Sequence, residues 1–127
     1  MREYPMLSAL TAIDFINMAV GLLTIGLGLL GWLAPRWTME QLDMVAGPTH
    51  MAYTEVSAVS GALFVGMGLG AMILNEPLGW VVMGLAYGGA AVGRVTSIFR
   101  DNAASRQSWT FFGAEAALAS WLILANI

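Results

Sequence analysis

The chain has 127 residues, of which 58% are hydrophobic and 10% charged, and it contains no cysteine. This composition excludes an ordinary soluble domain, and the missing cysteine excludes disulfides, thiolate catalysis and cysteine-ligated metals. Eight acidic and five basic residues give a formal net charge of −3. Because the arginines are scattered singly, no basic run offers a surface for nucleic acid. We therefore expect an all-α integral membrane protein.

Four apolar stretches follow one another, each long enough to cross a ~30 Å hydrocarbon layer as a helix. The first follows Pro5 and is stopped by Pro35, and it is too long for a signal sequence. Pro77 opens the third at a favoured first-turn position. The sequence therefore predicts a four-helix bundle that forms a single transmembrane domain over residues 1–127. Its helices are expected at about 8–34, 52–74, 77–99 and 109–126.

The segment between the first two spans is too polar to cross a membrane. Thr38 precedes Gln41 by three residues, a pattern typical of a helix N-terminal capping box. Four apolar residues recur there at helical spacing: Met39, Leu42, Val45 and Ala46. The pattern predicts a short interfacial helix at about 38–46. An irregular loop is the alternative.

Four crossings place both termini on one face of the membrane and the loops 35–51 and 100–108 on the other. The loop face carries three arginines and the terminal face one: Arg36, Arg100, Arg106 and Arg2. The positive-inside rule then predicts that the loops are cytoplasmic and both termini periplasmic, in a bacterial inner membrane.

Small residues recur every fourth position and form smooth stripes on the second and third predicted helices. The stripes comprise Ala58, Ala62, Gly66 and Gly70, then Gly84 and Gly88, and then Gly89, Gly93 and Ser97. Such stripes let helix backbones approach closely in a bilayer. They predict either a docking surface for another membrane protein or packing within the chain's own bundle. The run "GMGLG" at 66–70 is not a nucleotide loop, because no strand precedes it.

Arg94 lies inside an apolar span, where an isolated arginine costs about 2.5–3.5 kcal/mol near the bilayer centre. Counted from the loop face at ~1.5 Å per residue, Glu55, Arg94 and Glu115 lie at similar depths. We therefore predict a buried charge cluster of these three residues, with one negative charge in excess. In the alternative, the Arg94 side chain extends to the lipid headgroups and Glu55 belongs to the interface.

Three further polar residues are candidates to support this cluster. Tyr87 shares a helical seam with Gly84, Ala91 and Arg94. Asp14 and Asn17 lie one turn apart near the start of the first helix. We interpret both as interfacial residues, with a proton or ion site as the alternative.

His50 is the only histidine, and it precedes the second helix. A bis-histidine haem or a multi-histidine metal site within one chain is therefore excluded, and we expect no metal and no cofactor. A single axial bond from His50 to a haem or pigment of a partner remains open. No Ser-His-Asp set can be assembled at one depth, so the sequence does not predict an enzyme.

Three short stretches resemble the small bacterial membrane proteins of domain-of-unknown-function family 4345. They are "EVSAVSGALF", "GGAAVGRVTSIF" and "FFGAEAALA", and the Ala-Pro ending of the first helix agrees with them. The resemblance implies a four-helix membrane protein without an established activity. It also implies that five positions matter most: Glu55, Gly61, Gly93, Arg94 and Glu115.

The favoured function is a structural or accessory membrane subunit, which packs against a larger complex or against itself through the small-residue stripes. The alternative is a small oligomeric transporter or proton-linked carrier that uses the charge cluster. The expected partners are the lipid bilayer and other membrane subunits or further copies of the chain, without nucleic acid.

Overall fold

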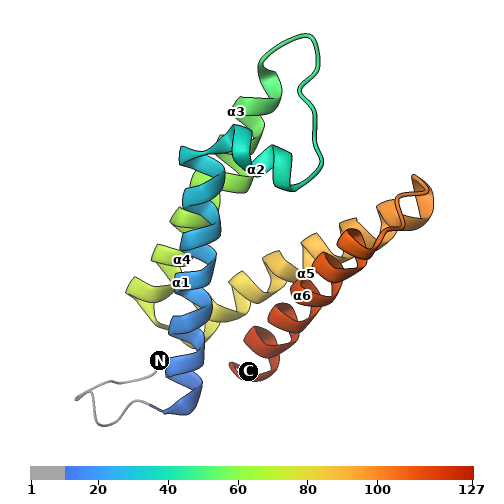
Figure 1. Ribbon diagram of the computed structural model, residues 1–127. Helices are drawn as coiled ribbons and strands as arrows, with labels where there is room; N and C mark the ends of the chain where they lie inside the picture. The colour runs from blue at the N-terminus through green and yellow to red at the C-terminus, as the bar shows by residue number, and fades with distance from the viewer. Residues whose placement is uncertain (1–10) are drawn as a thin grey trace. The chain divides into compact units, whose positions relative to one another are not determined.

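The computed structural model describes residues 11–127, and every regular element in this part of the chain is helical (Figure 1). The elements in chain order are α1 (Ala12–Leu33), α2 (Pro35–Gln41), α3 (Met51–Ser57), the π-helix η2 (Ala58–Ala62), α4 (Leu63–Leu74), α5 (Pro77–Arg100) and α6 (Arg106–Leu124). The segments α3, η2 and α4 form one continuous helix from Met51 to Leu74. The predicted helix start at Ser8 and the predicted position of Arg2 lie outside the described residues.

Within residues 11–127, three helices are long and apolar enough to cross a membrane: Ala12–Leu33, Met51–Leu74 and Pro77–Arg100. Large apolar side chains cover their surfaces, and Ile73 is 77% exposed. Such surfaces are expected in lipid, so these helices indicate a membrane protein. The predicted fourth span, α6, is not among them, because Arg106, Gln107 and Glu115 lower its hydropathy.

The predicted interfacial helix has different boundaries, since α2 runs from Pro35 to Gln41 and not over residues 38–46. Pro35 stands at the first helical position, where its fixed φ and missing N–H favour helix initiation. Thr38 is therefore inside the helix and does not cap it. Its hydroxyl donates to the carbonyl oxygen of Leu30 at 2.9 Å.

Asp43 ends α2 earlier than predicted. It takes a left-handed conformation with φ 55°. The N–H of Met44 then donates to the carbonyl of Met39, and the N–H of Asp43 donates to the carbonyl of Glu40. This pair of bonds is a Schellman motif with aspartate where glycine is usual. Residues 42–46, predicted to be helical, therefore lie outside the helix.

The last helix begins three residues before its predicted start at 109 and ends at Leu124, not at 126. Ser105 and Ser108 cap it reciprocally: the Ser105 hydroxyl oxygen accepts from the Ser108 N–H, and the Ser108 hydroxyl oxygen accepts from the Ser105 N–H. Serine replaces the usual glutamate of a capping box here, so the pattern was missed.

The chain divides into two compact units. Unit 1 contains residues 11–17 and 74–127 of the described chain, and unit 2 contains residues 18–73. Because α1 runs through both, the single domain predicted over residues 1–127 stays a prediction.

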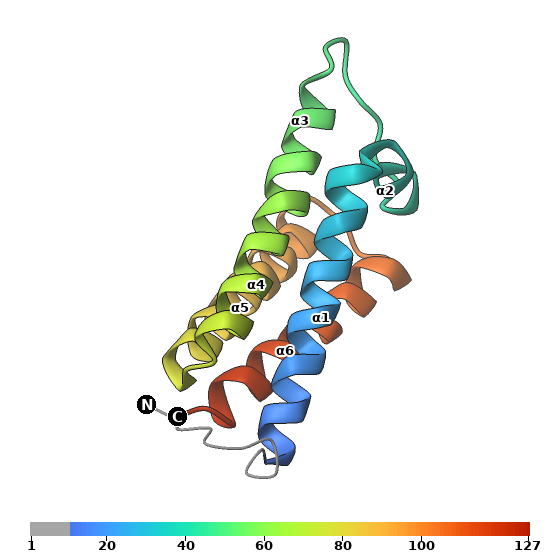
Figure 2. The ribbon, with the colours of Figure 1, turned by 90° about the vertical axis from the view of Figure 1, so that its left-hand side faces the viewer.

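In unit 2, α1 lies beside the continuous helix Met51–Leu74 (Figure 2), and glycine backbones make the contact. A Cβ placed on Gly31 would collide with the carbonyl oxygen of Ser60. A Cβ on Gly61 would lie 2.6 Å from the amide nitrogen of Trp32. Since backbone atoms cannot move aside, only glycine fits at these two positions.

The closest contact falls on η2, a single wide turn inside an otherwise α-helical span. Such π-segments are rare and change the direction of the residues that follow. Gly61 is buried within η2, and a Cβ on Gly28 of α1 would lie 2.7 Å from the Gly61 carbonyl oxygen. The π-turn therefore coincides with the point of closest approach in unit 2.

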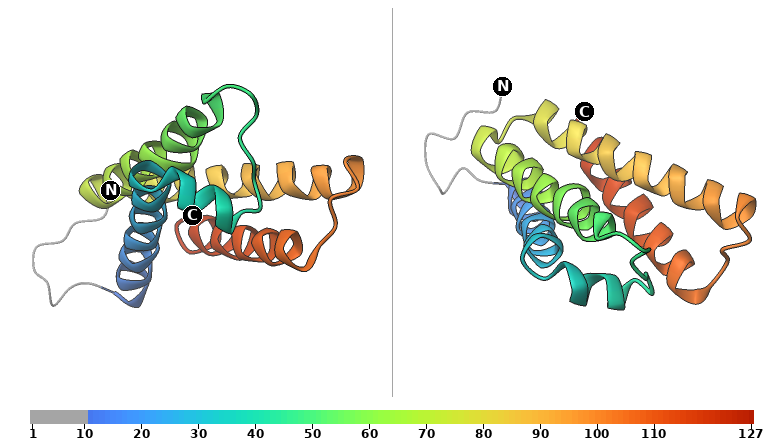
Figure 3. Two further views of the ribbon diagram at one scale, coloured as in Figure 1. Left: turned by 45° about the horizontal axis from the view of Figure 1, so that its top comes forward. Right: turned by 90° about the horizontal axis from the view of Figure 1, so that it is seen from above.

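In unit 1, α5 and α6 lie side by side (Figure 3). Gly84 provides the close approach, because a Cβ there would lie 2.9 Å from the Leu122 Cβ. Trp80, Met83 and Leu122 are almost completely buried. The Trp80 ring N–H donates to the Asn75 side-chain oxygen at 3.0 Å, which ties the start of α5 to the preceding turn.

Replacing Gly61 with alanine is expected to destabilise the protein by about 1–3 kcal/mol, because the added methyl meets backbone atoms that cannot move aside. Thermal unfolding in detergent, followed by circular dichroism, measures this change. The matched control is Gly26→Ala on α1, where a Cβ would have nothing within 4 Å. The control should be neutral or slightly stabilising. Equal melting temperatures for the two variants would contradict the backbone contact.

Candidate functional site

Arg94 of α5 and Glu115 of α6 form an ion pair inside unit 1. The Arg94 Nε donates to both carboxylate oxygens of Glu115 at 3.0 Å, and Nη2 donates to Oε1 at 2.6 Å. Charge-assisted bonds of this forked kind are stronger than neutral ones. The antiparallel packing of α5 and α6 thus brings together two residues that the sequence predicts to lie at similar depths.

The pair is partly buried, where the sequence predicted a buried cluster. The side chain of Arg94 is 36% exposed and that of Glu115 is 15% exposed. Phe111, one turn before Glu115, places its ring 5.2 Å from the Arg94 guanidinium carbon. The carboxylate accepts from the Nε and Nη2 edge of the guanidinium and the ring lies over a face, while Nη1 donates to no residue among 11–127.

Glu55, the third predicted member of the cluster, belongs to unit 2, and its side chain is exposed. Within unit 2, no neighbouring helix covers it. Its association with Arg94 stays a prediction. Tyr87, the predicted supporting residue on α5, is buried together with Gly84 and Ala91.

Asn17 is completely buried within the protein, and its predicted position at the membrane interface stays a prediction. Its side-chain nitrogen donates to the Asn126 side-chain oxygen at 2.9 Å, and its oxygen accepts from the Trp121 ring N–H at 3.1 Å. The Asn126 side chain also donates to the Leu122 carbonyl at 2.8 Å. This neutral cluster ties the beginning of α1 to the end of α6. Sequence spacing gave no signal for it, since its members lie more than a hundred positions apart.

Asp14 is buried too, and its carboxylate acts as a helix cap. Its Oδ2 accepts from the backbone N–H and from the hydroxyl of Thr11, both at 2.9 Å. The Asp14 N–H donates back to the Thr11 hydroxyl oxygen. These reciprocal bonds satisfy the free donors at the start of α1. This geometry gives Asp14 a structural role, and its interfacial position stays a prediction.

Buried polar atoms are satisfied throughout the described part of the chain. Within residues 11–127, no buried side-chain nitrogen or oxygen lacks a hydrogen-bond partner. Thr24, buried in the middle of α1, donates to the Val20 carbonyl at 2.8 Å. The same residues contain no group of three His, Asp or Glu side chains placed to hold a metal ion.

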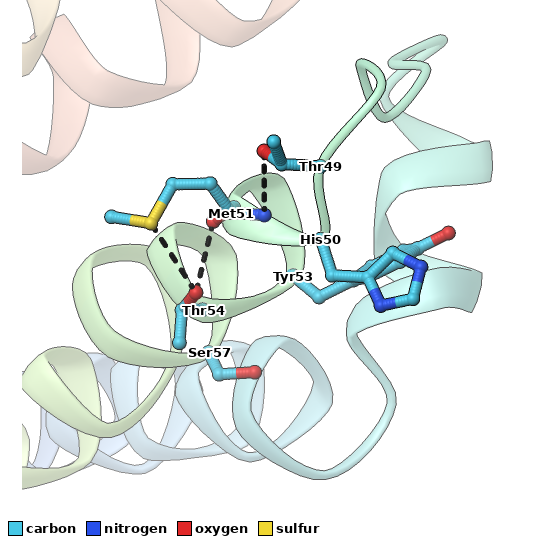
Figure 4. Close-up of a pocket in the computed structure, with 6 residues that line it drawn as sticks. All are labelled: Thr49, His50, Met51, Tyr53, Thr54 and Ser57. Atoms are coloured by element: carbon cyan, nitrogen blue, oxygen red, sulfur yellow. Dashed lines mark hydrogen bonds between the residues drawn. The ribbon is translucent and has the colours of Figure 1, made fainter.

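His50 lines a pocket of about 680 Å³ in unit 2 (Figure 4). The pocket is lined by Thr49, His50, Met51, Tyr53, Thr54 and Ser57. The His50 and Tyr53 rings lie 5.7 Å apart, and the Arg36 guanidinium lies 4.3 Å from the Tyr53 ring centroid. This is an aromatic and cationic contact of the kind found at membrane interfaces. Axial ligation by His50 to a group of a partner stays open.

The turn after α5 holds a second, exposed ion pair. The Arg100 guanidinium donates two hydrogen bonds to Asp101, and the Ser97 hydroxyl donates a third. Mainly through the Arg100 bonds, and then the Ser97 bond, the pKa of the Asp101 carboxyl is lowered to about 2. Asn102 follows in a left-handed conformation and closes α5 through a bond from the Ala103 N–H to the Ile98 carbonyl.

These features define a helical membrane protein with buried polar contacts between the helices of unit 1. The chain belongs to the family described as Domain of unknown function (DUF4345), whose model matches residues 12–126. The resemblance inferred from the sequence is thereby confirmed. Comparison with curated proteins and with solved structures found no match.

Replacing Arg94 with alanine should lower the free energy of unfolding by roughly 1–2 kcal/mol, because Glu115, which is 15% exposed, loses the ion pair with Arg94. Arg106→Ala is the matched control, since Arg106 is exposed and should change stability by less than about 0.5 kcal/mol. Chemical or thermal unfolding in detergent measures both. Equal effects would show that the Arg94–Glu115 bond contributes nothing to stability.

Acid should remove the stabilisation supplied by Asp101. Its folded-state pKa of about 2 lies below the ordinary value of 3.8, so the ionised carboxylate stabilises the fold above 3.8. That contribution decreases as the pH falls from 3.8 towards about 2. The difference in melting temperature between the wild type and Asp101→Asn is expected to shrink over this window. A difference that stays constant from neutral pH to pH 2 would contradict the assignment.

Proposed function

We propose that the protein is a small structural or accessory membrane subunit, which binds another membrane subunit or a second copy of itself through the glycine face of α4. This face is defined by Gly66 and Gly70. The proposal rests on one observation: no atom lies within 4 Å of the position that a Cβ would take on either glycine.

Other glycines of this protein contact a neighbouring helix, so the pair on α4 stands out because it contacts none. In unit 2, added Cβ atoms on Gly28, Gly31, Gly61 and Gly68 would all meet atoms at 3.0 Å or less. Gly84 does the same in unit 1. The chain therefore uses these glycines where helices approach closely, whereas Gly66 and Gly70, four residues apart on α4, have no such neighbour.

The neighbouring positions favour a protein occupant over lipid tails. Ala62 lies one turn before Gly66 and extends the smooth strip, while Leu69 and Ile73 stand exposed beside it. A shallow strip with large apolar walls fits a helix that packs at close range, and such contacts supply much of the association energy in a bilayer.

The proposal includes the membrane arrangement. With 19 residues, α6 is about 28 Å long at 1.5 Å per residue, enough to serve as a fourth crossing beside α5. Its costliest polar group, Glu115, is neutralised by Arg94. On α2, Met39 is buried and Arg36 and Glu40 are exposed, which favours a position on the membrane surface. The proposed location remains a bacterial inner membrane, with the loops in the cytoplasm and both termini in the periplasm.

The carrier hypothesis receives less support. It needs a carboxyl group that gains and loses a proton inside the membrane. Glu115 is held by three hydrogen bonds from Arg94, and Glu55 is exposed. We therefore favour the structural role.

Gly66→Leu and Gly70→Leu should each weaken the association by about tenfold or more, because the larger side chain keeps the partner backbone away. Purification in mild detergent, followed by native mass spectrometry, measures the fraction of chain bound to a partner. Gly26→Leu is the matched control: this glycine is also open, but leucine occupies the positions four residues before and after it.

A cross-link identifies the partner. The chain has no cysteine, so Gly70→Cys introduces a unique thiol. A disulfide or bismaleimide product that contains a second copy or another subunit supports the proposal. A wild-type chain that remains monomeric at every protein concentration, with no co-purified subunit, would overturn it.

A further inference from the structure

A second feature of unit 1 points to a ligand. A groove of about 320 Å³ runs along the last turns of α5 to the beginning of α6. Its lining includes Ala90, Gly93, Arg94, Ser97, Ala103 and Ser108. Gly93 leaves its floor open, because a Cβ there would meet nothing within 4 Å. The groove is thus a small, mostly apolar hollow with one charged group.

Some N–H groups of this charged residue, Arg94, are not used in its bonds to Glu115. A guanidinium carries five N–H groups in a planar fork. Nε and Nη2 donate to Glu115. Nη1 donates to no residue in the part of the chain that the structure describes. The side chain is 36% exposed and lines the groove. The free N–H groups therefore include those of Nη1.

The hydroxyls of the groove are already engaged. Ser97 donates to the Asp101 carboxylate, and Ser108 donates to backbone carbonyls within its own cap. Ser97 and Ser108 thus leave Arg94 as the main donor to anything that enters. A ligand for this site must accept hydrogen bonds.

The charges near the groove are mostly paired. The stretch 94–115 carries three arginines, Arg94, Arg100 and Arg106, and two acids, Asp101 and Glu115. Both acids are bound to arginines. The remaining charge, that of Arg106, does not line the groove, so an anion would be bound through the N–H groups of Arg94 and not through a net charge.

The groove reaches from Arg94 to the turn that follows α5. Arg94 stands six residues before the end of α5, about 9 Å along the helix axis at 1.5 Å per residue. With 24 residues, α5 is about 36 Å long and exceeds a ~30 Å hydrocarbon core, so its ends reach into the headgroup layer. Ala103 and Ser108 line the groove beyond Arg94, so the groove gives a headgroup a path to the guanidinium.

We propose that this groove binds the phosphate group of an anionic phospholipid, with the free N–H groups of Arg94 as donors. Arginine suits phosphate because its planar fork can make two parallel bonds to the phosphate oxygens. The apolar floor formed by Ala90 and Gly93 accommodates the glycerol region and the first acyl carbons. The site is separate from the α4 face, so either proposal can fail alone.

Lipid binding to the full-length chain in mild detergent tests this site. Native mass spectrometry would follow titration with phosphatidylglycerol and, in parallel, with phosphatidylcholine, whose net charge is zero. The wild type is expected to bind phosphatidylglycerol about tenfold more tightly than phosphatidylcholine. Gly93→Leu fills the groove without touching the Arg94–Glu115 bonds, and it should reduce that affinity by about tenfold.

Arg94→Gln should cause a similar loss of binding, with circular dichroism confirming that the variant is folded. Arg106→Gln removes a charge from the same region but not from the groove, so its affinity should stay within about twofold of the wild type. Wild-type affinity in Gly93→Leu, or an equal loss in Arg106→Gln, would overturn the proposal.

Inorganic phosphate distinguishes the two sources of the same chemical group. If the lipid is the ligand, millimolar phosphate should neither displace phosphatidylglycerol nor raise the melting temperature. If phosphate alone raises the melting temperature of the wild type but not of Gly93→Leu, the groove takes free phosphate and the lipid assignment is wrong.

Discussion

Helices in a hydrocarbon layer gain little from burying apolar side chains against one another, because lipid tails are equally apolar. Close backbone packing and polar bonds must then hold them together. Both units of this protein follow that constraint. Unit 2 is held where Gly31 and Gly61 let two backbones touch, and unit 1 is held by Gly84 and by side-chain hydrogen bonds. The exposed leucines, isoleucines and valines face outward, as lipid contact requires.

The two polar contacts of unit 1 differ in burial and in charge, and therefore in the role that each can have. The Asn17–Asn126 contact is neutral and buried, and its donors are engaged. It has the properties of a structural tie between helix ends. The Arg94–Glu115 pair is charged and half-exposed, and it leaves N–H groups free. Ligand recognition is therefore expected at the second contact, where a group entering from the headgroup layer finds unoccupied donors.

Sequence reasoning was most accurate where a single residue imposes a local rule. Pro77 begins α5 as predicted, and the helix before the turn ends at Leu74 as predicted. The predicted helix boundaries were wrong where a residue other than the usual one caps the helix. Asp43 takes the place of a C-terminal glycine, and Ser108 takes the place of the capping glutamate, so α2 and α6 begin and end elsewhere than expected. For the site, depth counting paired Arg94 with Glu115 correctly, whereas the association of the exposed Glu55 with them stays a prediction.

Composition and apolar run length by themselves determined that this is a helical membrane protein, because these properties depend on each segment alone. Short motifs determined its family for the same reason. Only the tertiary structure decided which glycines contact another helix. Small residues that recur every fourth position define a helix face, but they do not determine what packs against it. It also decided that Asn17 meets Asn126 and that a π-turn lies at Gly61, because both depend on how separate helices pack.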